Sequence, residues 1–139
     1  MANPLDTGSP GLPAETIKAL AQEILTREPV DVLIIIMLLR TLEIEVPAYY
    51  TMNGVEPPPF GSYLRGLVEP LAALKKETGK DVVMVLENRA HLLEEVEVEA
   101  MSRSVGKKFQ DEGIPVYLSV ERALRGIYHA LTSKKFRCH

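Results

Sequence analysis

Apolar and polar positions follow two different periods along this chain, and each change of period marks a new element. Apolar residues recur at three- and four-residue spacing over four stretches, which predicts helices with one buried stripe at about 13–25, 64–78, 94–112 and 119–135. Between these stretches lie short apolar runs rich in β-branched residues, which predict strands at 31–37, 81–86 and 116–118. Helices and strands therefore alternate along the chain.

Glycine, proline and serine mark where these elements begin and end. Gly79 and Gly113 are suited to the left-handed conformation that closes a helix, and Pro115 prevents the third helix from continuing. Ser119 can cap the amide groups at the start of the last helix. Pro70, inside the second helical stretch, is expected to kink or split that helix.

Alternating strands and helices predict an α/β fold with a parallel sheet covered on both sides. The architecture expected is a three-layer sandwich, flavodoxin-like or Rossmann-like. The last helix should bury Leu124 and Ile127 against the sheet, so Leu124→Ala is expected to cost about 2–5 kcal/mol. The whole chain, residues 1–139, is expected to form one domain.

One segment, residues 38–61, lacks any sustained period. It holds the run Pro57-Pro58-Pro59 and the aromatic residues Tyr49, Tyr50 and Phe60. We interpret it as a proline-rich insertion with the character of a long loop. Its aromatic side chains either pack over a strand end or against a partner, or the insertion only covers an edge of the sheet.

Composition sets limits on the class of protein. The net charge of −3 gives no reason to expect binding to nucleic acid or to an anionic membrane. The single cysteine, Cys138, excludes an internal disulfide and fits a reducing compartment. The longest apolar run, Val32 to Leu39, is far shorter than a membrane span, and the first residues do not resemble a signal peptide. We expect a cytoplasmic protein.

Most signatures of an autonomous catalytic site are missing from the sequence. Neither a phosphate-binding G-x-x-x-x-G-K-[ST] loop nor a G-x-G-x-x-G turn is present, and one cysteine with three scattered histidines predicts no metal site. His91 follows a predicted strand, but exposure to solvent explains it more simply, and packing or solvent explains His129. Four acidic residues most simply form a solvated first turn of the third helix: Glu94, Glu95, Glu97 and Glu99.

Several motifs nevertheless occur in the order seen in one family of domains. They are Asn3-Pro-Leu-Asp6, Pro29-Val-Asp-Val-Leu-Ile34, Val83-Met-Val-Leu-Glu87 and Gly113-Ile-Pro-Val-Tyr-Leu-Ser-Val-Glu-Arg-Ala123. The chain resembles the flavodoxin-like ligase module of the NDP-forming acyl-CoA synthetases, which include acetate–CoA ligase (ADP-forming), succinyl-CoA synthetase and the FdrA-like proteins. The resemblance spans nearly the whole chain apart from the proline-rich segment.

The resemblance implies part of an acid–CoA ligase rather than a complete enzyme. Family members combine such a module with CoA-binding, phosphohistidine and ATP-grasp domains, so CoA and ATP or ADP belong to the complete enzyme and no catalytic residue or cofactor is expected in this chain. In succinyl-CoA synthetase an Asn-Ile-Phe-Gly-Gly loop follows the first strand and serves a phosphoryl group. Here Met37-Leu38-Leu39-Arg40 occupies that place, which leaves Arg40 as a charge for an anion.

A few further positions carry over from the family. Asp6 matches the aspartate of the first motif, and Gly8 stands at its glycine-rich turn. Glu87 matches the acidic residue that ends a later strand, and Asn88 and Arg89 occupy the loop that follows. All of them are expected near strand ends or helix starts, where open α/β sheets bind ligands.

Simpler structural explanations remain for these positions, and two classes of function follow. Ser119 matches the Ser/Thr that begins the family's last helix, but helix capping alone explains it, and structural hydrogen bonding explains Asp6 and Glu87. The chain is either a module that works with other domains or subunits of an acyl-CoA synthetase, or a non-catalytic regulatory or interaction domain that kept the fold. A homo-oligomer is compatible with both.

Overall fold

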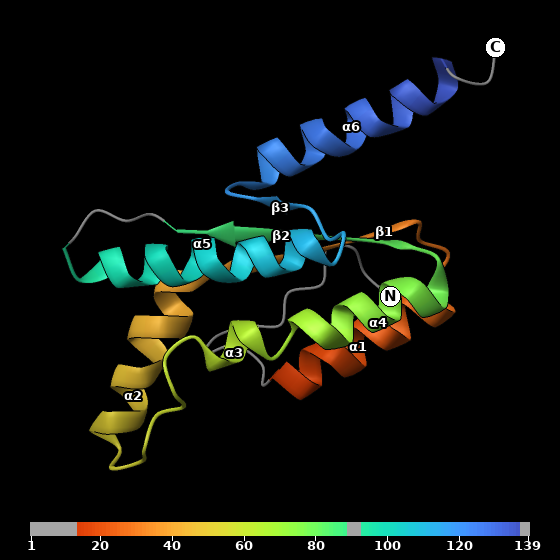
Figure 1. Cartoon of the computed structure of the whole chain (residues 1–139). Helices are drawn as coiled ribbons and strands as arrows, with labels where there is room; N and C mark the ends of the chain where they lie inside the picture. The colour runs from red at the N-terminus through yellow and green to blue at the C-terminus, as the bar shows by residue number, and fades with distance from the viewer. Residues whose placement is uncertain (1–13, 89–92, 137–139) are drawn as a thin grey trace.

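The computed structural model describes residues 14–88 and 93–136, which form a parallel sheet with helices (Figure 1). In chain order the elements are α1 (Ala14–Arg27), β1 (Val32–Leu38), the π-helical turn η1 (Thr41–Glu45), α2 (Val46–Met52), α3 (Ser62–Arg65), α4 (Val68–Thr78), β2 (Asp81–Glu87), the 3-10 turn η2 (Leu93–Glu95), α5 (Val96–Asp111), β3 (Val116–Tyr117) and α6 (Val120–Phe136). The α/β class and the alternating order expected from the sequence are confirmed.

The described strands form an open three-stranded sheet in the order β1-β2-β3, and all of them run parallel. Val32 pairs with Asp81 at one end of β1 and Leu38 with Glu87 at the other, while Val85 of β2 pairs with Tyr117 of β3. The central strand β2 is buried from Val82 to Leu86. A strand buried on both faces needs a continuous apolar run, as the sequence shows.

One face of the sheet carries the main hydrophobic core. Helices α1, α4 and α5 pack on this face (Figure 1), against the side chains of β1 and β2 that point toward them. The predicted inward stripe of α5 is confirmed, because its four members are almost fully buried: Val98, Met101, Val105 and Phe109. Phe109 is the largest of the fully buried side chains.

The predicted helix boundaries also hold. The second helical stretch is split into α3 and α4, and Pro70 lies in the first turn of α4, where it has no N–H to donate to the carbonyl of Gly66. Gly79 and Gly113 both have positive φ angles, 67° and 75°, after α4 and α5. Their conformation closes each helix as expected.

Of the described helices, α6 lies on the opposite face and rises away from the sheet toward its C-terminal end (Figure 1). Ala123 is buried, and Val120 and Ile127 pack partly against β2. The prediction for Leu124 is wrong: its side chain is 53% exposed. The contact stripe is centred on Ala123 and Ile127, so Leu124 falls on the flank of the helix beyond the sheet.

The segment 38–61 is more regular than the expected loop. Residues 39–52 are helical through η1 and α2, and Pro47 lies in the first turn of α2, where a missing N–H costs little. From residue 53 to 61 the chain forms turns and irregular structure. Tyr49, Tyr50 and Phe60 are exposed. The sequence did not reveal α2 because this helix buries no residue, so it has no apolar stripe at helical spacing. The segment was therefore expected to be a loop.

Candidate functional site

Four of the predicted positions lie at one edge of the sheet, the edge where its parallel strands end. Arg40 follows β1, and Ser119 follows β3. Glu87 is the last residue of β2, and Asn88 comes directly after it. Parallel strands bring these positions to the same side, where α/β sheets hold their ligands.

The remaining predicted positions are not placed by the structure. Asp6, Gly8 and Arg89 lie outside the described residues, as does His91.

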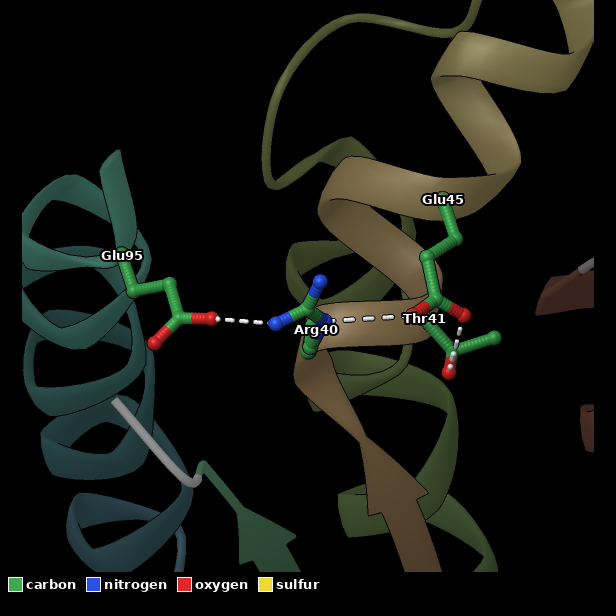
Figure 2. A network of polar contacts seen from close by, with 4 residues as sticks. All are labelled: Arg40, Thr41, Glu45 and Glu95. Atoms are coloured by element: carbon green, nitrogen blue, oxygen red, sulfur yellow. Dashed lines mark hydrogen bonds and ion pairs between the residues drawn. The ribbon is translucent and has the colours of Figure 1, made fainter. Parts of the chain in front are cut away.

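Arg40 is the centre of a polar network at this edge (Figure 2). Its Nη1 donates to Oε1 of Glu95 at 2.9 Å, and its Nε donates to Oε1 of Glu45 at 3.1 Å. The second oxygen of Glu45 accepts a hydrogen bond from Thr41 Oγ1 at 3.0 Å. Figure 2 shows the two carboxylates on opposite sides of the guanidinium group. The network ties the turn after β1 to the start of α5.

Glu95 is buried, with 1% of its side chain exposed, whereas the side chain of Arg40 is 48% exposed. The expectation of a solvated acidic turn is therefore wrong for Glu95. A carboxylate can be buried here because a guanidinium group from the neighbouring strand end compensates its charge. Two carboxylates flank one guanidinium, so Arg40 does not present an uncompensated positive charge at this edge.

The end of β2 contributes two further side chains. Glu87 is half-buried at the end of the strand, opposite Leu38 of β1. Asn88 follows it, and both polar atoms of its amide, Oδ1 and Nδ2, are buried without a hydrogen-bond partner among the described residues. Buried amide groups are normally paired, so Asn88 marks this strand end as an unusual polar position.

Ser119 acts as the cap of α6. Its Oγ accepts a hydrogen bond from the backbone N–H of Arg122 at 3.3 Å, the amide three residues further on. This is the contact expected of an N-cap serine. It satisfies one of the free amide groups at the start of α6 and accounts for Ser119 without a ligand.

A second polar site, which we did not predict, joins η1 to the start of α3. Oε2 of Glu43 accepts a hydrogen bond from the backbone N–H of Gly61 at 2.7 Å. Gly61 has a φ of 68°, and a Cβ at this position would lie 2.8 Å from Cγ of Met101. Both the conformation and the space therefore require glycine.

Burial shifts the pKa values of two side chains at this second site, Glu43 and Tyr63. Oε1 of Glu43 has no hydrogen-bond partner among the described residues, and burial raises the pKa of Glu43. The hydrogen bond from Gly61 and the charge of Arg65 act in the opposite direction but do not outweigh burial. Burial likewise raises the pKa of Tyr63 to about 12.

The burial of Glu95 could have been predicted from the sequence, whereas the contact of Glu43 could not. Glu95 precedes Val98, Ser102 and Val105 at spacings of three, seven and ten residues, so it lies on the inward stripe of α5. An acidic residue on such a stripe predicts a buried ion pair. Glu43 lies in a segment without periodicity, and its partner is a backbone amide 18 residues away, which no pattern of side chains reveals.

Arg40, the described arginine that follows β1, is already paired with two carboxylates, so it is poorly suited to bind a phosphate. Within residues 14–88 and 93–136 no cluster of three or more His, Cys, Asp or Glu side chains is arranged to hold a metal ion. The described polar network fixes the turn after β1 against the start of α5.

Searches against protein-family models, curated proteins and solved structures gave no match for this chain. None of the described helices combines the length and the apolar character needed to cross a membrane.

Proposed function

We propose that this chain is a module of an NDP-forming acyl-CoA synthetase, an acid–thiol ligase that joins an acid to CoA at the expense of a nucleoside triphosphate. The supporting observation is where the resembling motifs fall. Pro29–Ile34 leads into β1, Val83–Glu87 forms the last five residues of β2, and Gly113–Ala123 runs from just after α5 through β3 into α6. These three motifs each include part of a strand, and two of them, Val83–Glu87 and Gly113–Ala123, reach the carboxyl edge of the parallel sheet. The fourth motif, Asn3–Asp6, lies outside the described residues.

In this role the chain supports phosphoryl transfer and acyl-CoA formation without supplying a catalytic residue. CoA, ATP or ADP and the phosphohistidine would be provided by the CoA-binding, ATP-grasp and phosphohistidine domains. The contribution of this chain is a rigid surface at the carboxyl edge, where the Arg40–Glu95 pair fixes the turn after β1. Enzymes gain rate from such positioning when the reacting groups come from separate domains.

A second function is favoured by the electrostatics of this edge. Arg40 is flanked by two carboxylates, and the turn after β1 has no glycine that would let a phosphate approach the backbone. These features suit a non-catalytic regulatory or interaction domain that kept the fold and lost the phosphate-binding loop.

The test is whether the chain binds the other parts of such a ligase. The chain would be mixed with the CoA-binding, phosphohistidine and ATP-grasp domains of an acetate–CoA ligase (ADP-forming) and followed by sedimentation velocity. We expect a complex that contains this chain. A flavodoxin of similar size serves as the control and should sediment separately. Separate sedimentation of this chain as well would refute the module and leave the interaction domain.

A further inference from the structure

The sheet face that carries α6 is left partly uncovered along β1. Side chains of β1 alternate between the two faces, and Val32 and Ile34 pack on the α6 side. Ile36 and Leu38 point the same way but are 48% and 53% exposed. We call these four side chains the open face. No described residue pairs with the outer edge of β1, and a bare apolar edge strand promotes association unless something covers it.

Helix α6 carries exposed apolar side chains of its own. Leu124, Tyr128 and Leu131 lie on one flank, and the C-terminal half of the helix projects from the sheet (Figure 1). An amphipathic helix owes most of its stability to packing of its apolar face, and in this projecting half Tyr128 and Leu131 remain exposed.

An apolar groove lies between α6 and the start of the strands. Its volume is about 140 Å³, and its lining includes Val32, Val83, Tyr117, Ile127 and Leu131. The groove is open to solvent on one side, next to the open face of β1. The described part of a single chain therefore leaves the space between α6 and its sheet incompletely filled.

Charge distinguishes α6 from the rest of the chain. Residues 120–136 contain one acidic residue, Glu121, and four basic residues, whereas the rest of the chain contains 18 acidic and 12 basic residues. A basic helix that projects from an acidic body is attracted to the acidic body of another copy. This complementarity favours self-association over binding to an uncharged or basic partner.

We propose that a second copy of this chain covers the open face, with α6 of each copy lying across β1 of the other. Both surfaces belong to the same chain, so a two-fold axis lets each copy give its helix and receive the helix of its partner. A stable dimer buries roughly 800 Å² on each partner. The open face, the flank of α6 and the groove supply an apolar centre, and the charged residues around α6 supply the rim.

Sedimentation equilibrium of the full chain over a wide range of concentrations tests this proposal. We expect a reversible dimer, and we expect Ile36→Glu and Leu131→Glu each to raise its dissociation constant by about tenfold or more. Both side chains are half exposed in the single chain, so the monomer should keep its circular dichroism spectrum. The matched control is Met52→Glu, whose side chain is 86% exposed and belongs to α2, which lies on the other side of the sheet from α6 (Figure 1).

Three results would overturn the proposal. The first is a chain that stays monomeric at every concentration. The second is a dimer that neither Ile36→Glu nor Leu131→Glu weakens, because its interface would then lie elsewhere. The third is a chain that is monomeric alone but whose complex with the ligase domains is weakened by the same two substitutions, because the open face would then bind those domains. The dimer does not depend on the proposed ligase function, and each can fail separately.

Discussion

The half-buried carboxyl group of Glu43 links the stability of this chain to pH. Burial raises its pKa from the ordinary value of 4.5, so the folded chain holds this proton more tightly than the unfolded chain. Where the folded chain binds more protons, the free energy of unfolding falls as pH rises. The contribution of Glu43 to stability is therefore complete below pH 4.5 and is lost as pH rises through its folded pKa.

We predict that Glu43→Gln removes this part of the pH dependence. Glutamine keeps an oxygen that can accept the hydrogen bond from Gly61 but does not ionise. Urea unfolding across the range from pH 4.5 upward should show a flatter dependence for the variant than for the parent chain. The control is Glu97→Gln on the exposed side of α5, which should keep the parental slope. Parallel curves for the parent and Glu43→Gln would contradict the assignment.

The Arg40–Glu95 pair should contribute more to the free energy of unfolding than the Arg40–Glu45 pair. Arg40→Ala removes the ion pair between Arg40 and the buried carboxylate of Glu95, and we expect a loss of about 2 kcal/mol in the free energy of unfolding. Glu45 is half exposed, so Glu45→Ala should cost less than about 1 kcal/mol. Denaturant unfolding of the two variants at neutral pH makes the comparison. Equal losses would mean that burial of Glu95 does not decide the strength of the network.

Residue-level chemistry was the part of the site least accessible from the sequence. The capping role of Ser119 could be predicted because a cap and its helix are neighbours in the chain. The partners Arg40 and Glu95 are 55 residues apart, and only the parallel pairing of β1 with β2 brings their elements together. Pairing of this kind depends on the whole fold rather than on local spacing.

At the scale of elements, Gly126 and Tyr117 fix the place of α6 on the sheet. A Cβ added at Gly126 would overlap the hydroxyl group of Tyr117, so the ring of Tyr117 lies against α6 only because this helical residue has no side chain. Glycine inside a helix costs about 1 kcal/mol relative to alanine. The close approach of β3 to α6 compensates for this cost.

We predict that Gly126→Ala destabilises the parent chain by about 1–3 kcal/mol, because the added methyl group overfills the contact. In a Tyr117→Leu background the same substitution should stabilise by up to about 1 kcal/mol, since only the helix propensity remains. A double-mutant cycle by urea unfolding at one protein concentration measures both steps. A Gly126→Ala variant more stable than the parent would show that Tyr117 does not pack on α6 as described.

Elements with a buried face were predictable, and elements without one were not. The predicted strand at 81–86 matches β2 to within one residue. The prediction succeeded because β2 is buried on both faces, so its apolar run is continuous. Helix α5 shows its stripe clearly for the same reason. Helix α2 buries no residue, so its sequence shows no period. Leu124 belongs to a stripe that the sequence presents as continuous, but the α6 residues that pack on the sheet are Val120, Ala123 and Ile127.

At the scale of the whole molecule, the chain has one complete core and one incomplete surface. The side of the sheet with α1, α4 and α5 is closed, whereas the side with α6 leaves apolar side chains of β1 in contact with solvent. The proposed dimer and the proposed ligase module would each use this exposed apolar surface for contact with another chain or domain.

The central claim, that this chain is the ligase module of an acyl-CoA synthetase, is tested most directly by restoring activity. An acetate–CoA ligase (ADP-forming) lacking its own module would be assayed for loss of CoA thiol that requires acid and nucleotide, with and without this chain. We predict no activity for the chain alone or for the truncated ligase alone, and measurable acyl-CoA formation when they are combined. Nucleotide-dependent thiol loss by the isolated chain, or none in the mixture although the parts bind, would contradict the claim.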